Sequence, residues 1–204
     1  MADSAFHSPF AEHLACERPS RHGQIQVRLH AQTLPSVTLI STWPSGTAAL
    51  CTALAQALGA TDMFPLPAAT GQTAPCPMGL LLRTGPTEFM LIGEAGADVA
   101  GVLRGQVGSD VGSVLDLSHA RVRIQMQGPQ AVAALGKLFA LDFRLAAFPL
   151  DTLQLSGHHH VPCSVHRVGE DRFELYLLST YAHGQLESLI DASLEYGVAL
   201  TLGH

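Results

Sequence analysis

Positive charge is scarce in this chain of 204 residues. It carries 11 Lys and Arg against 17 Asp and Glu, which gives a formal net charge of −6, and Lys137 is the single lysine. Proteins that hold nucleic acid or anionic lipid neutralise phosphate groups with clustered basic residues. The composition therefore predicts a protein whose partners include neither nucleic acid nor a membrane surface.

Paired cysteines and long apolar segments are also missing. The four cysteines are Cys16, Cys51, Cys76 and Cys163. They lie far apart and form no CxxC pair, so their spacing predicts neither a disulfide framework nor a structural zinc site. No window is long enough and free enough of charge to span a bilayer, and the N-terminal residues lack the basic start of a secretory signal. We therefore expect a cytoplasmic protein with reduced thiols.

Hydrophobic residues, in contrast, are abundant. They make up 47% of the chain, whereas charged residues make up only 14%. This composition excludes a mostly disordered chain, and the length suits one large domain or two small ones. A surface so low in charge is typical of a protein that buries part of it against partners.

An internal repeat organises the chain. Residues 83–91 (RTGPTEFML) and 167–175 (RVGEDRFEL) share one hairpin pattern, in which Arg, Gly, Phe and Leu recur at a constant offset of 84 positions. Around each hairpin, apolar spacing predicts the order strand, helix, strand, strand, helix, strand. We therefore expect an α+β fold of tandem ferredoxin-like βαββαβ repeats with antiparallel sheets.

The repeat also predicts the domain boundaries. We expect an N-terminal arm over residues 1–24, a first half over 25–118 and a second half over 119–204, with both halves in one compact pseudo-symmetric body. Leu50, Leu54 and Leu58 predict the buried face of a helix in the first half, and Pro129 is expected at the first position of a helix in the second. Residues 64–77, rich in Pro and Gly, predict a long exposed loop.

Asp116, Ser118 and His119 place an acid, a hydroxyl and an imidazole within four positions. On an extended chain Asp116 and Ser118 point to one face and His119 to the other, which is unsuitable for the proton relay of a catalytic triad. We therefore expect a turn at the end of a strand, in which the Asp116 and Ser118 side chains bond to backbone amides. A catalytic role is the less favoured alternative.

A histidine cluster offers the best metal candidate. His158 and His160 alternate onto one face, with Cys163 and His166 downstream, and imidazole and thiolate suit zinc or copper. Alternation places Cys163 on the opposite face, however, and His residues after Ser156-Gly157 fit an exposed hairpin turn. We favour the turn and expect no metal site.

Several arginines share predicted strand faces or hairpins: Arg121, Arg123, Arg83 and Arg167. A guanidinium group can receive a carboxylate or phosphate. A solvated, salt-bridged sheet face is the favoured interpretation. No GxxxxGK[ST] or complete GxGxxG motif indicates a nucleotide site.

Several short segments together carry a resemblance to a known family: Asp116–Arg121, Gly128-Pro129, Leu141-Asp142, Phe148-Pro149, 167–173 and Ser179–Ala182. Over roughly residues 78–195 the chain resembles the gamma (small) subunit of heterotetrameric sarcosine oxidase. The Asp-x-Ser-His and Gly-Pro segments also resemble the folate-binding aminomethyltransferases, the glycine-cleavage T-protein group, whose fold contains tandem units of this kind.

The resemblance implies a role in a cytoplasmic complex with alpha, beta and delta subunits. Such a complex demethylates sarcosine to glycine, with tetrahydrofolate as one-carbon acceptor and hydrogen peroxide as product. FAD, FMN, NAD and tetrahydrofolate are expected in the partner subunits, and this chain is expected to be an accessory subunit with no cofactor or active site of its own. The matched positions, expected to be structural, are Asp116, Ser118, His119, Arg121, Gly128 and Pro129.

Two alternatives stay open. The tandem fold also suits a free-standing folate-binding or C1-transfer protein. A metal-binding protein that uses His158, His160 and His166 is the third and weakest hypothesis.

Overall fold

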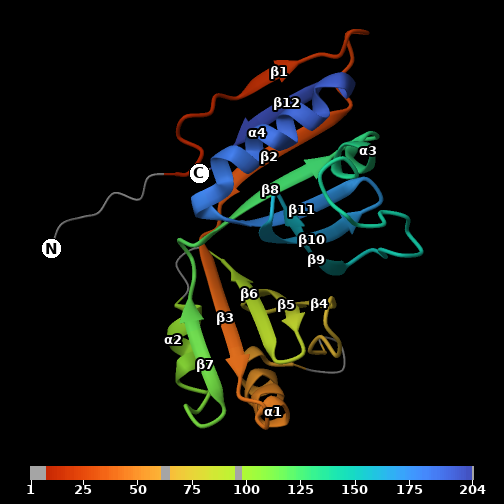
Figure 1. Ribbon diagram of the computed structural model, residues 1–204. Coiled ribbons are helices and arrows are strands. Elements are labelled where there is room, and N and C mark those ends of the chain that lie inside the picture. The colour runs from red at the N-terminus through yellow and green to blue at the C-terminus, as the bar shows by residue number, and fades with distance from the viewer. Residues whose placement is uncertain (1–7, 61–64, 95–97, 204) are drawn as a thin grey trace, which may run out of the picture. The chain divides into compact units, whose positions relative to one another are not determined.

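The computed structural model describes residues 8–60, 65–94 and 98–203 (Figure 1). The chain divides into two compact units, each of which is described by itself. Unit 1 comprises Met1–Thr33, Ala120–Leu150 and Ser156–His204, and unit 2 comprises Leu34–His119 and Asp151–Leu155. Within the described ranges, no helix combines the length and the apolar character needed to cross a bilayer.

Unit 2 contains a five-stranded antiparallel sheet in the order β4-β5-β6-β3-β7. Its elements are β3 (Ser36–Thr42), α1 (Thr47–Leu58), β4 (Thr73–Cys76), β5 (Gly79–Gly85), β6 (Glu88–Gly93), α2 (Val99–Arg104) and β7 (Gly112–Asp116). The predicted helical face is confirmed, since Leu50, Leu54 and Leu58 are buried in one cluster with residues of the sheet and α2. β4 interrupts the long loop expected over residues 64–77, of which Phe64 lies outside the described residues.

Unit 1 contains a seven-stranded sheet in the order β1-β12-β2-β8-β11-β10-β9. Its strands are β1 (Cys16–Arg18), β2 (Val27–Thr33), β8 (Arg121–Gln127), β9 (Thr152–His158), β10 (Val161–Gly169), β11 (Arg172–Leu178) and β12 (Val198–Leu202), and its α-helices are α3 (Ala131–Leu135) and α4 (Ala182–Ser193). The first residues of β9, up to Leu155, were expected in the second half but group with unit 2. Both helices contribute to one hydrophobic core with the inward side chains of the sheet, and Figure 1 shows α4 running along β12 and β2.

The N-terminal residues correct the predicted boundaries. Phe10 is buried in the core of unit 1, and Cys16–Arg18, expected in an arm, pair with β12. Residues 27–33, expected in the first half, form β2, which lies parallel to β12 and antiparallel to β8. The physical reason is that β2 buries Val27, Leu29 and Ala31 in the core of unit 1. The α+β class is confirmed, but the larger sheet is mixed rather than antiparallel.

Candidate functional site: the polar face of the seven-stranded sheet

The segment that resembled a catalytic triad is a hydrogen-bonded turn. Asp116 Oδ1 accepts bonds from the Ser118 hydroxyl (2.6 Å) and the Ser118 backbone amide (3.0 Å), and these two bonds hold the pKa of Asp116 below its ordinary value. Ser118 Oγ in turn accepts a bond from the backbone amide of Val37 (3.1 Å). His119 follows in the same turn and is exposed. The predicted turn, with side chains bonded to backbone amides, is therefore confirmed.

The Gly-Pro motif lies where β8 leads into α3. Gly128 has a φ of +127°, and a Cβ atom built there would lie 2.3 Å from the carbonyl oxygen of Gln26, so this position requires glycine. Pro129 was expected at the first helical position, but α3 begins at Ala131 and Gln130 is its N-cap. At the other end of β8, Arg121 projects from the face opposite the core.

The three consecutive histidines form the turn between β9 and β10. His159 and His160 have positive φ angles of 49° and 65°, which reverses the chain and breaks the alternation that was expected to align His158 with His160. The predicted turn is confirmed, and His159 and His160 are exposed.

His158 is buried, contrary to the expected exposed turn. Its ring lies 5.3 Å from the Phe139 ring and 4.5 Å from the His159 ring, measured between centroids. Burial, followed by the charge of His159, lowers the pKa of His158 to about 4. Burial also raises the pKa of Cys163 to about 11. Among the described residues, no group of three or more His, Cys, Asp or Glu side chains is placed to hold a metal ion.

Arg167 binds backbone carbonyls instead of a ligand. Its guanidinium group donates to the carbonyl oxygens of Phe143 (2.7 Å), Phe148 (3.0 Å), Gly169 (3.3 Å) and Glu170 (2.5 Å). The group also lies 5.0 Å above the ring of Phe173. Arg167 is thereby buried and connects the chain after α3 to the β10–β11 hairpin.

Arg83 makes the equivalent contacts in unit 2. It donates to the carbonyl oxygens of Pro67 (3.2 Å), Ala68 (2.5 Å), Gly85 (3.4 Å) and Pro86 (2.8 Å), and it lies 5.2 Å above the ring of Phe89. Both hairpins also shift register at the same place, between Arg83 and Gly85 and between Arg167 and Gly169. These two arginines therefore make matching structural contacts with backbone carbonyls.

The best candidate for a functional surface is the face of the seven-stranded sheet that is turned away from the core, hereafter the polar face. Alternation on β2, β8 and β11 sends apolar side chains into the core and polar ones to the opposite face. Cross-strand pairing arranges these polar residues in three rows, Arg28–Gln127–Arg172, His30–Gln125–Glu174 and Gln32–Arg123–Tyr176.

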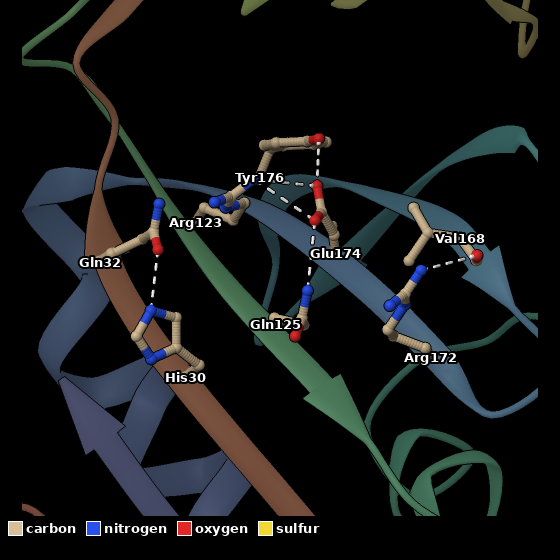
Figure 2. A network of polar contacts seen from close by, with 8 residues as sticks. All are labelled: His30, Gln32, Arg123, Gln125, Val168, Arg172, Glu174 and Tyr176. Atoms are coloured by element: carbon tan, nitrogen blue, oxygen red, sulfur yellow. Dashed lines mark hydrogen bonds and ion pairs between the residues drawn. The ribbon is translucent and has the colours of Figure 1, made fainter. Parts of the chain in front are cut away.

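Glu174 is the centre of a hydrogen-bond network on the polar face (Figure 2). Its carboxylate accepts bonds from Arg123 Nη1 (3.3 Å), Gln125 Nε2 (3.4 Å) and the hydroxyl of Tyr176 (2.7 Å). Tyr176 is only 2% exposed, and burial together with the charge of Glu174 raises its pKa well above the ordinary value. Tyr176 is therefore a neutral hydrogen-bond donor, and the network fixes the side chain of Arg123.

His30 on β2 makes a second, separate group of polar contacts on the polar face. Its two ring nitrogens lie 2.9 Å from Thr201 Oγ1 and 2.9 Å from Gln32 Oε1, so both nitrogens have a partner. Figure 2 shows the contact with Gln32. Arg28 and Arg172, in contrast, are exposed at the end of the face where β2 and β11 begin.

The sequence predicted only part of this face. Arg121 and Arg123 were identified as outward-facing on one strand, but the residues of β2 and β11 were missed. The pairing of Arg28 with Gln127 and of Gln127 with Arg172 joins segments far apart in the chain. The alternation of Arg28, His30 and Gln32 with buried residues is the signal that could have revealed β2.

Comparisons with known proteins agree on the family. The model of the GCVT N-terminal domain matches residues 76–202, more than half of the chain. The sarcosine oxidase gamma subunit of Corynebacterium sp. (strain U-96) is 31% identical over 144 residues, 70% of each chain. The gamma subunit of an Arthrobacter species is 31% identical over 145 residues, 71% of this chain and 70% of the relative.

Solved structures extend the likeness to nearly the whole chain. A chain of the heterotetrameric sarcosine oxidase from Corynebacterium sp. U-96 superposes with a TM-score of 0.77 at 28% identity. The superposition covers 95% of this chain and 97% of the Corynebacterium chain. The aminomethyltransferase T of the glycine cleavage system from Bartonella henselae shares the fold, with a TM-score of 0.59 at 19% identity. This superposition covers 89% of this chain and 49% of the aminomethyltransferase chain. With a GCVT-like fold and this degree of identity, the chain belongs to the family of sarcosine oxidase gamma subunits.

Proposed function

We propose that this chain is an accessory subunit of a heterotetrameric sarcosine oxidase, with alpha, beta and delta subunits as its partners. The observation that carries the proposal is the superposition on a chain of such an enzyme over 95% of this chain. In this proposal the complex is cytoplasmic, and the partner subunits hold FAD, FMN, NAD and tetrahydrofolate. They carry out the oxidative demethylation of sarcosine, which yields glycine and hydrogen peroxide.

The roles of the polar side chains support an accessory function. Asp116 and Ser118 stabilise a turn, and Arg83 and Arg167 bind carbonyl groups within their own units. His158, the most buried of the three consecutive histidines, packs beside the rings of Phe139 and His159. The residues that the sequence singled out for chemistry thus act in the architecture of the chain.

A comparison of the isolated chain with its complex tests the proposal. The chain is expressed alone in one preparation and captured from its own cells through a mild tag in the other, and both are assayed for flavin absorbance and sarcosine-dependent peroxide. We expect both signals in the captured material and neither in the isolated chain. Turnover of sarcosine by the isolated chain would contradict the accessory role.

A free-standing folate-binding or C1-transfer protein is the second candidate. It is favoured by the match to the GCVT N-terminal domain and by the shared fold of an aminomethyltransferase. A ligand that binds the native state raises the melting temperature in proportion to the logarithm of its concentration. Titration of the isolated chain with tetrahydrofolate would reveal this activity as such a rise, and the leading proposal predicts no shift.

The fold also supports the proposal that the two units are copies of one ferredoxin-like βαββαβ repeat. The order β5-β6-β3-β7 is that of a split βαβ unit. In unit 1 the corresponding strands are β10, β11, β8 and β12, with β2 inserted between β8 and β12. The matching contacts of Arg83 and Arg167, 84 residues apart, support a common origin of the two units.

A further inference from the structure

The chain ahead of β1 is attached to unit 1 through side chains. Residues 8–14, hereafter the N-terminal segment, form two successive turns, in which the amides of Ala11 and His13 donate to the carbonyl oxygens of Ser8 and Phe10 (3.0 Å each). In the part of the chain that the structure describes, the hydrogen bonds of this segment stay within it. Phe10, which is 2% exposed in the core of unit 1, therefore provides much of the attachment.

His13 makes the second contact between the N-terminal segment and the body of unit 1. Its ring lies 4.5 Å from the ring of His183 on α4, measured between centroids, and Figure 1 shows this part of the chain, in red, beside α4. The Nε2 atom of His13 is buried and has no hydrogen-bond partner among the described residues. A positive charge on a buried group without a partner costs free energy, so this packing requires a neutral His13.

The charged groups around His13 come from three elements: Glu12 of the N-terminal segment, Arg18 of β1, and His183, Glu187 and Asp191 of α4. Arg18, Glu187 and Asp191 line, together with His13, a cavity of about 290 Å³. The carboxylates of Glu12 and Glu187 favour a charged His13. Burial and the charge of His183 outweigh them, and the pKa of His13 is lowered from its ordinary value of 6.5.

Acid therefore acts against the contact between the two histidines. A protonated His183 pairs with Glu187, whose Oε1 lies 3.6 Å from its Nε2. A second proton, on His13, would place two positive charges about 4.5 Å apart, where they repel each other. Since the N-terminal segment makes no hydrogen bond to the rest of the described chain, its departure from α4 breaks side-chain packing alone.

We infer that the N-terminal segment is a pH-sensitive latch on unit 1, which is seated on α4 while His13 is neutral and opens more readily once His13 binds a proton. The inference is independent of the proposed function, because it concerns contacts within unit 1 alone. The released segment binds the proton more tightly than the seated one does. Seating is thus strongest above about pH 6.5 and weakens as the pH falls below this value.

Opening of the latch changes the surface at the ends of β2 and β12. Phe10 and His13 line a second cavity, of about 350 Å³, together with Thr33 at the end of β2 and Leu202 at the end of β12. When Phe10 leaves the core, the apolar side chains that it covers are opened to solvent. Acid thus increases the exposure of an apolar surface that is covered at neutral pH.

Hydrogen exchange of the full chain, followed by mass spectrometry at pH 7.5 and pH 5.5, tests the inference. Each rate is divided by the intrinsic rate of an unstructured chain at the same pH, and β8 serves as the internal reference for global unfolding. The variant His13→Phe retains a ring beside His183 but cannot bind a proton. The matched control is His22→Phe, which replaces an exposed histidine of the same part of the chain that contacts Arg21 instead of α4.

We expect the corrected exchange of residues 10–13 in wild type to rise at least about twofold from pH 7.5 to pH 5.5. One proton bound below pH 6.5 limits the rise to about tenfold. The His22→Phe control should match wild type, and His13→Phe should show no rise. The variant His183→Phe, which removes the second charge, should show a smaller rise than wild type.

Three results would overturn the latch. The first is equal exchange of residues 10–13 in wild type at both pH values, and the second is the same rise in a folded His13→Phe variant. The third is an equal rise in β8, which would show that the whole of unit 1 opens. Thermal unfolding shows whether each variant is folded, and if His13→Phe is not, the comparison of His183→Phe with wild type decides in the same way.

Discussion

Gly128 holds a backbone conformation that other residues rarely adopt, at a place where the Gln26 carbonyl oxygen leaves no room for a Cβ atom. We predict that Gly128→Ala lowers the free energy of unfolding by roughly 2–3 kcal/mol, because it adds both backbone strain and a clash. Urea unfolding measures this loss. The matched control is Gly184→Ala on α4, where a Cβ atom meets nothing within 4 Å and the helix gains up to about 1 kcal/mol. Equal stability of the two variants would contradict the account.

His158 makes stability depend on pH in a defined direction. Burial lowers its pKa from 6.5 to about 4, so the unfolded chain binds a proton at a higher pH than the folded chain does. The contribution of neutral His158 is complete above about pH 6.5 and is lost as the pH falls toward 4. Linkage gives a loss of about 2 kcal/mol at pH 5.

The variant His158→Phe isolates this effect. It retains an aromatic ring beside Phe139 and removes the titrating group, so its unfolding free energy should fall less than that of wild type between pH 7.5 and pH 5. Urea unfolding at the two pH values provides the comparison. An identical pH dependence in both proteins would show that His158 is not the responsible group.

At the scale of elements, local patterns were predictable and distant pairings were not. The stripe of Leu50, Leu54 and Leu58 and the turn at Asp116 depend on neighbouring residues, and the structure confirms both. The membership of β2 in unit 1 depends on its parallel pairing with β12, which joins residues such as Val27 and Val198. No local pattern specifies such a partner, so this strand was assigned to the wrong half.

The arginines of the two hairpins show the same limit. The repeat identified Arg83 and Arg167 as equivalent, but their acceptors are backbone carbonyls. Every residue has a backbone carbonyl, so no residue type in the sequence identifies these acceptors. The sequence favoured a solvated, salt-bridged face for these arginines, which is wrong for Arg167, because its guanidinium group is buried against backbone carbonyls. The β2 and β11 residues of the polar face were missed for a related reason, because its rows form only when three distant strands pair.

The contacts of Arg167 lead to a prediction about the chain between α3 and β9. Arg167→Met leaves the buried carbonyl groups of Phe143 and Phe148 without this donor, which should lower the free energy of unfolding by roughly 3–4 kcal/mol. Hydrogen exchange followed by mass spectrometry should show faster exchange over residues 142–150.

The control for this prediction lies in the same hairpin. Arg172→Met removes an exposed guanidinium group with one long bond, so stability should change by less than about 0.5 kcal/mol. If both substitutions cost the same, the carbonyl contacts of Arg167 would not be the source of the stability.

At the scale of the whole molecule, the observations connect family, charge and surface. The chain belongs to the family of sarcosine oxidase gamma subunits, and only 14% of its residues are charged. Both features are expected of a protein that buries part of its surface against other subunits of a larger assembly.

Native mass spectrometry of the endogenous protein, captured through a mild tag at moderate salt, tests that central claim most directly. The account predicts a complex much heavier than 21.6 kDa that contains this chain together with larger flavin-bearing subunits. Recovery of the chain alone, as a monomer or as a homodimer, would contradict the account.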